Sequence, residues 1–150
     1  MKDLSTVSNL FLDEVLNNLA VSLHSLEGES ILYIDDEYVN YLYFSEILSG
    51  TGAKILRAFT TNQALSFIAV ENQVCLTIVA ESFTWRMNNR IVSQVKNISP
   101  DMPVIGIFET DNGKSKSKFL QSGCDLYISR YIDNIHLVEM INELLKISDN

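Results

Sequence analysis

Residues 31–37 read ILYIDDE, an apolar run that ends in an acidic cluster. Residues 75–80 read CLTIVA, a second apolar run, which ends in Ala80. Runs that are apolar on both faces are typical of parallel strands covered by helices on both sides of a sheet. Such sheets bind ligands at the carboxyl ends of their strands. The sequence therefore places Asp35, Asp36 and Ala80 at the edge of the sheet where a site is expected.

From residue 30 onward the chain alternates between strand-like and helix-like segments. Apolar runs predict five strands, over about 30–35, 53–58, 74–80, 103–108 and 125–129. Segments of helical period follow them, over 38–49, 61–70, 91–98, 115–122 and 135–145. This alternation predicts a doubly wound α/β sheet.

Two of the predicted helices carry more detailed signals. The helix over 38–49 is expected to gather its apolar residues on one face, namely Val39, Leu42, Tyr43 and Ile47. The next helix follows Thr60 and Thr61, either of which is a suitable N-cap.

Residues 1–28 lie outside the alternating pattern, and we treat them as a unit separate from residues 29–150. Their apolar residues recur every three or four positions, at Leu4, Val7, Phe11, Val15, Leu19, Leu23 and Leu26. This spacing predicts an amphipathic helix that Gly28 could end. Two interpretations stay open: the helix packs on its own domain, or it mediates dimerisation or binds a partner.

Composition excludes several classes of function. The net charge is −8, which argues against a nucleic-acid partner because phosphate binding needs clustered Lys and Arg. No segment has the roughly 18–20 consecutive apolar residues of a membrane span, and the N-terminus makes a poor signal peptide, so a cytoplasmic location is the default expectation. Cys75 and Cys124 lack a CxxC spacing, which favours two reduced thiols over a disulfide or metal site.

Over residues 30–147 the order and spacing of these features resemble the receiver domains of two-component response regulators. The acidic pair Asp35 and Asp36 carries the resemblance, together with the alignment anchors Pro100, Pro103 to Ile105, and Gly123 to Asp125. Residues 37–41 and 49–53 are especially similar to receivers attached to hybrid sensor kinases. The resemblance implies a flavodoxin-like five-stranded parallel sheet of order 2-1-3-4-5, here with an extra N-terminal helix, and a place in signal transduction or a phosphorelay.

The resemblance also implies that the phosphorylation site is degenerate. The acceptor Asp of the family falls on Ala80, which has neither a nucleophile nor a metal ligand. The hydroxyl residue at the end of the fourth strand falls on Phe108, and the conserved Lys falls on Arg130. Arg keeps the positive charge, but its planar fork does not replace an ammonium. We therefore expect a pseudo-receiver that is not an enzyme and has no catalytic residue.

The expected function is a phosphorylation-independent protein–protein interaction module. Its partner is expected to be a signalling protein, either a sensor kinase or a downstream effector. The implied surface is the fourth helix, fifth strand and fifth helix, with the N-terminal helix, and a homodimer through either surface stays open. Two alternatives remain: a phosphoacceptor at Glu81, or a small-ligand sensor that uses the pocket vacated at Ala80. Strand alternation argues against Glu81, because it would face away from a pocket that Ala80 faces.

Three further expectations concern the site. Asp35 and Asp36 could hold Mg²⁺ weakly with a carbonyl near Ser82, or could instead form a salt bridge to Arg130 without any cofactor. Tyr127 matches the aromatic switch position of the family, and Phe108 is expected to hold it in one rotamer. Trp85, expected in a loop, is either an exposed anchor for a partner or a lid over the pocket.

Overall fold

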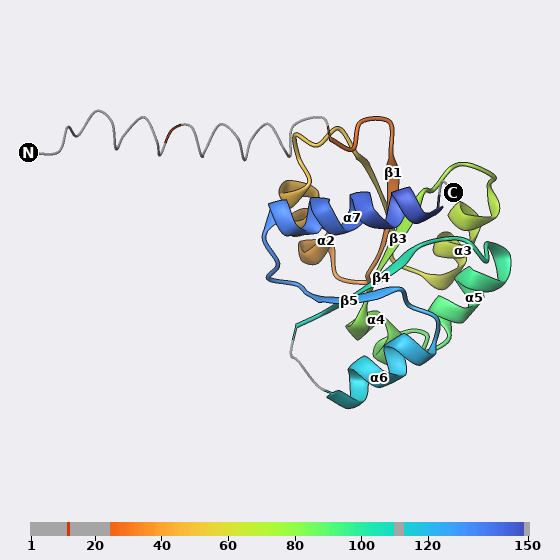
Figure 1. Ribbon diagram of the computed structural model, residues 1–150. Coiled ribbons are helices and arrows are strands. Elements are labelled where there is room, and N and C mark those ends of the chain that lie inside the picture. The colour runs from red at the N-terminus through yellow and green to blue at the C-terminus, as the bar shows by residue number, and fades with distance from the viewer. Residues whose placement is uncertain (1–11, 13–24, 110–112, 149–150) are drawn as a thin grey trace, which may run out of the picture.

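The computed structural model describes residue 12, residues 25–109 and residues 113–148 (Figure 1). The predicted amphipathic helix over residues 1–28 lies outside the described residues, apart from Leu12 and its last four positions. In the described parts of the chain, no helix is both long and apolar enough to cross a membrane.

Five strands form one parallel sheet, and their bounds lie close to the predicted ones. They are β1 (Ser30–Ile34), β2 (Lys54–Ala58), β3 (Leu76–Ala80), β4 (Val104–Phe108) and β5 (Leu126–Ser129). The order across the sheet is β2-β1-β3-β4-β5, which confirms the predicted topology. In this register Ile34 pairs with Ala58, and Ala80 with Ile107, so the strands end together at one edge.

Six helices connect or follow these strands in the described residues. They are α2 (Tyr38–Ile47), α3 (Thr61–Ala69), α4 (Glu81–Arg86), α5 (Ile91–Ile98), α6 (Gly113–Gln121) and α7 (Asn134–Ser148). Thr60 accepts a hydrogen bond from the Gln63 N–H, which confirms one of the two predicted N-caps of α3. The short helix α4 was not predicted: it begins directly after β3, so Trp85 lies on a helix and not in a loop.

The helices cover both faces of the sheet, and each face has its own core. Helices α2 and α7 pack on one face, where Phe44, Leu48, Leu137 and Ile141 are buried (Figure 1). Helices α3, α4, α5 and α6 cover the other face. Leu26, just before β1, is buried with the α2 and α7 side chains.

The buried face of α2 differs from the predicted one. Asn40 and Phe44 are buried, whereas Val39 and Leu42 are exposed. The prediction was wrong for Val39 and Leu42 but right for Tyr43 and Ile47, which are partly buried and pack against the core. Helix α2 is apolar around most of its circumference, so periodicity cannot select one face. Contacts decide instead: Phe44 packs against Tyr33, with ring centroids 5.2 Å apart, and Asn40 reaches the carboxylate of Asp35.

Candidate functional site

A small cavity opens at the carboxyl ends of β1, β3, β4 and β5. Its volume is about 150 Å³. Its lining joins aromatic and aliphatic side chains to carboxylates and one guanidinium: Tyr33, Asp35, Asn40, Phe44, Ala80, Glu81, Ser82, Trp85, Ile107, Glu109 and Arg130. The cavity therefore brings together most of the residues at which the sequence placed a site, with Asp36, Phe108 and Tyr127 outside its lining.

Asp35 is buried at the end of β1 and is held by three donors. Its Oδ2 accepts hydrogen bonds from the Tyr33 hydroxyl at 3.0 Å and from Asn40 Nδ2 at 2.9 Å. Its Oδ1 accepts the Glu37 N–H at 2.9 Å. Burial raises the pKa of Asp35 above its usual range, while these hydrogen bonds act in the opposite direction. Burial next to this carboxylate also raises the pKa of Tyr33.

Asp36 points to a different partner. Arg86 donates to both of its carboxylate oxygens, from Nη2 at 2.7 Å and from Nε at 3.0 Å. Arg86 also pairs with Glu37 at 3.0 Å. The hydrogen bonds from Arg86 lower the pKa of Asp36. An Arg that binds both oxygens of one carboxylate is a specific and charge-assisted arrangement.

The predicted salt bridge from the acidic pair to Arg130 is therefore wrong. Arg130 pairs with Glu109 at the end of β4, and Arg86 takes the place beside Asp36. The reason is local geometry: the chain turns into α4 as soon as β3 ends, and the last turn of that helix carries Arg86 back over the acidic pair. Because the sequence indicated a loop after β3, it did not predict the contact between Arg86 and Asp36.

Ala80 and Glu81 both face the cavity, which corrects the expectation that Glu81 faces away. Ala80 is 4% exposed and Glu81 is 5% exposed. The alternation rule fails here because Glu81 is the first residue of α4 and no longer belongs to the strand. The Glu81 carboxylate accepts a hydrogen bond from the Tyr127 hydroxyl.

Tyr127 also contacts Phe108, as the sequence led us to expect. The two rings are stacked, with centroids 4.4 Å apart and planes inclined by 20°. Phe119 of α6 lies against the same tyrosine at 5.6 Å. Tyr127 is thus held on its ring by two phenylalanines and at its hydroxyl by Glu81. That these contacts fix one rotamer stays a prediction.

The acidic pair does not fit the Mg²⁺ site that the resemblance implies. Mg²⁺ requires near-octahedral oxygen ligands. Here the oxygens of Asp35 are engaged by three protein donors and those of Asp36 by Arg86, and Ala80 at the end of β3 offers no carboxylate. Within residues 25–109 and 113–148, no group of three or more His, Cys, Asp or Glu side chains is arranged to hold a metal ion. The positive charge at this edge comes from Arg86 and Arg130.

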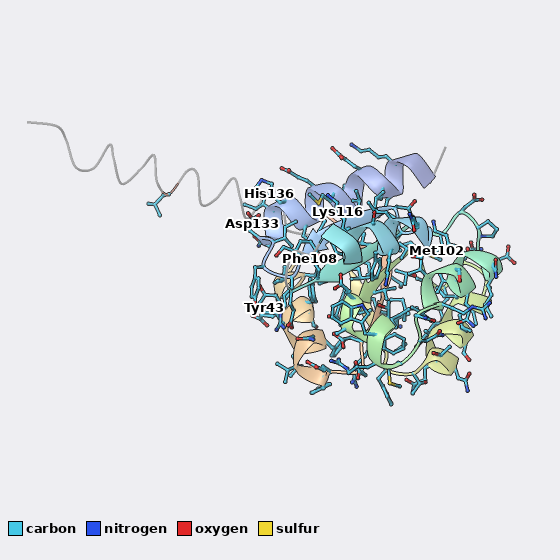
Figure 2. The ribbon with its side chains drawn as sticks, turned by 90° about the horizontal axis from the view of Figure 1, so that it is seen from below. Tyr43, Met102, Phe108, Lys116, Asp133 and His136 are labelled. Carbon is cyan, nitrogen blue, oxygen red and sulfur yellow. The ribbon has the colours of Figure 1, made fainter. Side chains whose placement is uncertain are left out.

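Other residues singled out in the sequence lie apart from this arrangement or at its rim. Trp85 is 66% exposed and lines the rim of the cavity, a position compatible with either predicted role. His136 contacts Asp133 at the start of α7 (Figure 2), with 2.6 Å between Nδ1 and the nearer carboxylate oxygen. Cys75 and Cys124 are free thiols.

Comparisons with known proteins establish the fold. A scan against protein families gives no match, and a search of curated proteins gives none either. Among solved structures, a CheY-like receiver domain protein from Methanospirillum hungatei JF-1 is 21% identical, with a TM-score of 0.70 over 81% of this chain and 96% of that one. A receiver domain protein from Clostridium thermocellum is also 21% identical, with a TM-score of 0.71 over 81% and 97%. A two-component response regulator from Clostridium difficile is 19% identical, with a TM-score of 0.71 over 81% and 99%. The chain has the flavodoxin-like fold of these receivers.

Proposed function

We propose that this domain is a pseudo-receiver, a protein-interaction module in signal transduction that works without phosphorylation. The observation that carries the proposal is Ala80, whose methyl group stands at the end of β3 beside the buried Asp35. Phosphoryl transfer to a carboxylate needs a nucleophilic oxygen and cations positioned around the transferred group. Ala80 offers no such oxygen, and the cations Arg86 and Arg130 are already paired with carboxylates.

The contacts of Tyr127 support a domain that is held in one state. In a conformational switch, an aromatic side chain moves between two positions, and a change nearby favours one of them. Here Phe108 stacks on the ring and Glu81 accepts a hydrogen bond from the hydroxyl, so both ends of Tyr127 are engaged without any added group. The domain would then present one fixed surface to its partner.

We expect the partner to be a sensor kinase or a downstream effector in the cytoplasm, bound through α6, β5 and α7. Two exposed apolar side chains on this side support the choice, Leu120 on α6 and Tyr131, two residues after the end of β5. Aromatic residues are enriched at the centres of protein interfaces.

A phosphoacceptor at Glu81 is the second candidate function. It is favoured by one observation, that Glu81 is buried in the same cavity as Asp35. Phosphorylation there would form an acyl phosphate on the carboxylate and would disrupt the hydrogen bond from Tyr127. The small-ligand sensor remains a third proposal, supported by the cavity and its apolar walls.

The deciding experiment is a titration of the whole chain with Mg²⁺ and beryllofluoride, a mimic of a phosphoryl group on a carboxylate. Trp85 is the single tryptophan and lines the cavity, so its fluorescence reports on the site. The amide NMR signals around Tyr127 give a second readout. Incubation with acetyl phosphate followed by mass spectrometry detects a covalent product directly.

We expect no saturable change in either readout and no gain of a phosphoryl group. A Mg²⁺-dependent response that disappears in Glu81→Gln would contradict the proposal and assign the acceptor to Glu81. Ser82→Ala is a matched control, because it changes a neighbouring cavity residue without removing a carboxylate. Thermal shifts with a panel of metabolites test the ligand sensor separately.

A further inference from the structure

Strand β2 forms one edge of the sheet, because among the described residues it pairs only with β1. The Lys54 N–H and the Ala58 carbonyl form hydrogen bonds at the two ends of β1. In a parallel ladder the backbone groups of every second residue turn toward the same neighbour. The N–H and C=O groups of Ile55 and Arg57 therefore point away from β1 and out of the sheet. We call these four backbone groups the β2 edge.

The β2 edge is short and has defined ends. The Ala53 N–H donates to Thr51 Oγ1 at 3.2 Å, and the Phe59 N–H donates to Gln63 Oε1 at 3.0 Å. Side chains of the domain thus satisfy the backbone N–H groups on either side of the edge. Within the part of the chain that the structure describes, no such partner reaches the β2 edge itself. An extended segment of another chain would supply the missing donors and acceptors.

The charged side chains of β2 are both cationic. Lys54 is exposed and Arg57 is half-buried, and among the described residues neither forms an ion pair with a carboxylate. The Arg57 guanidinium lies 4.7 Å from the centroid of the Phe59 ring and 5.0 Å from that of Tyr38. In a chain with a net charge of −8, two such cations on one strand favour an acidic occupant. They disfavour a second copy of β2, which would bring like charges together across the junction.

A hollow beside β2 and α3 adds a second requirement for the occupant. Its volume is about 510 Å³, and its lining is Arg57, Asn62, Gln63, Ser66, Phe67 and Gln73. The Arg57 guanidinium lies on the α2 side of the sheet, where it contacts Tyr38. Successive side chains of an added strand point alternately to the two faces of a sheet. One set would therefore lie beside Arg57, and the other would enter the hollow beside Phe67.

We propose that the β2 edge binds an extended acidic segment of a partner protein as an added strand. Acidic residues of this segment face Arg57 and alternate with apolar residues that enter the hollow. Side chains directly opposite each other in an antiparallel pair of strands lie about 4.5–5.5 Å apart, which is within reach of an ion pair. Strand β5, part of the surface proposed above for a signalling partner, lies at the opposite edge of the sheet. This inference therefore does not depend on the proposed function.

The first test measures amide hydrogen exchange in the full chain without any partner. The N–H groups of Ile55 and Arg57 should exchange at least about tenfold faster than those of Leu56 and Ala58, which the register directs toward β1. Equal protection of all four groups at every protein concentration would mean that a segment of the same chain covers the edge. Protection of Ile55 and Arg57 that rises with concentration would mean that a second copy covers it. Either result overturns the proposal.

The second test titrates the labelled full chain with the end-blocked peptide Glu-Val-Glu-Val-Glu. Saturable downfield shifts of the Ile55 and Arg57 amide protons are expected, because these groups gain hydrogen-bond acceptors. The peptide Lys-Val-Lys-Val-Lys has the same backbone and the opposite charge, and it should not bind. An N-methylated form of the acidic peptide, which lacks backbone donors, should not bind either. No saturable shift with the acidic peptide, or equal binding of either control peptide, would overturn the proposal.

The third test removes the positive charge of β2. Arg57→Gln should weaken binding of the acidic peptide by about two- to fivefold, the range of a solvent-accessible ion pair. Lys54→Gln, at the exposed start of β2, gives a second measure of the same effect in a variant that leaves the aromatic contacts of Arg57 intact. Arg90→Gln is the matched control, because Arg90 precedes α5 and is not part of β2, and it should leave binding unchanged. Equal effects of Arg57→Gln and Arg90→Gln, or no effect of either β2 variant, would overturn the charge pairing.

Discussion

Asp35 and Asp36 are adjacent in sequence, yet their surroundings move their pKa values in opposite directions. Burial raises the pKa of Asp35, so its ionised form disfavours folding and the stability present at low pH is lost as pH rises through the raised pKa. Arg86 lowers the pKa of Asp36, so this carboxylate contributes stability above its unfolded pKa of about 3.9, which is lost as pH falls through the lowered pKa. The two residues therefore make opposite contributions to acid stability.

Replacing Arg86 by Gln tests this electrostatic assignment. At pH 7 the change should lower the free energy of unfolding by about 0.5–1 kcal/mol, because the ion pair is largely exposed to solvent. The difference from the unmodified chain should shrink as pH falls below about 4, where Asp36 loses its charge in the variant first. Urea unfolding at pH 7 and pH 3 measures both values.

Arg90→Gln provides the control, since the Arg90 side chain forms no ion pair among the described residues. A loss of stability in Arg86→Gln that is the same at both pH values would show that Arg86 acts by packing and not by charge.

For single residues, the sequence predicted where a residue lies in the sheet better than which side chain it contacts. Ala80 could be placed at the end of β3 because the apolar run and its end are local features. The side to which Glu81 points could not be predicted, because the strand rule no longer holds where α4 begins. The cation beside Asp36 could not be predicted either, since Arg86 and Arg130 have side chains long enough for several partners and only the tertiary structure selects between them.

Among the secondary-structure elements, β4 and α6 are in unusually close contact. A Cβ added to Gly106 in the middle of β4 would lie 2.5 Å from the Phe119 ring of α6. Phe119 in turn packs against Tyr127, so the glycine allows α6 to approach the sheet and support that tyrosine. The close approach of α6 thus explains why β4 has a glycine at position 106.

Gly106→Ala is expected to destabilise the domain by about 1–3 kcal/mol, because the added methyl group forces Phe119 away from the sheet. Thermal or urea unfolding measures the loss, and near-ultraviolet circular dichroism should report the altered Tyr127 environment. Gly113→Ala is the matched control at the start of α6, where an added Cβ meets no atom within 4 Å. If both variants lose the same stability, the close packing of β4 and α6 is not the cause.

Helix α2 shows why an element can be predicted while its orientation is not. Its bounds follow from the apolar residues after the acidic cluster, but those residues surround the helix. Asn40, a polar residue that periodicity assigns to the surface, is buried because the Asp35 carboxylate requires a donor. The burial of one polar group thus decides which apolar residues are left outside.

For the whole molecule, the strand order could be anticipated because each of the five apolar runs is short, separate and suited to burial on both faces. The two cysteines lie on opposite faces of the sheet, so the reactivity of each thiol reports on the packing of one face. Cys75 packs against the core under α2 and α7, and Cys124 lies in the core on the other side. Burial raises the pKa of each thiol to about 12.

Both thiols should therefore react slowly in the folded protein, because the thiolate is the reactive form. At pH 8 we expect a disulfide reagent to label them at least about a hundredfold more slowly than free cysteine. Both should react fully in denaturing urea. Equal labelling rates would indicate that the two faces open together in one cooperative unfolding event, whereas rapid reaction of one thiol in the native state would contradict its burial.

The core under α2 and α7 joins residues that lie far apart in the chain, from Leu26 to Leu145. During synthesis on a ribosome, β1 emerges early, but its edge toward β3 and its face toward α7 stay uncovered until much later residues have been made. A domain with this connectivity cannot complete its folding until its final helix leaves the exit tunnel. Termination before α7 would release a chain in which the part of the sheet that α7 covers is exposed, and such a chain would be a substrate for chaperones and proteases.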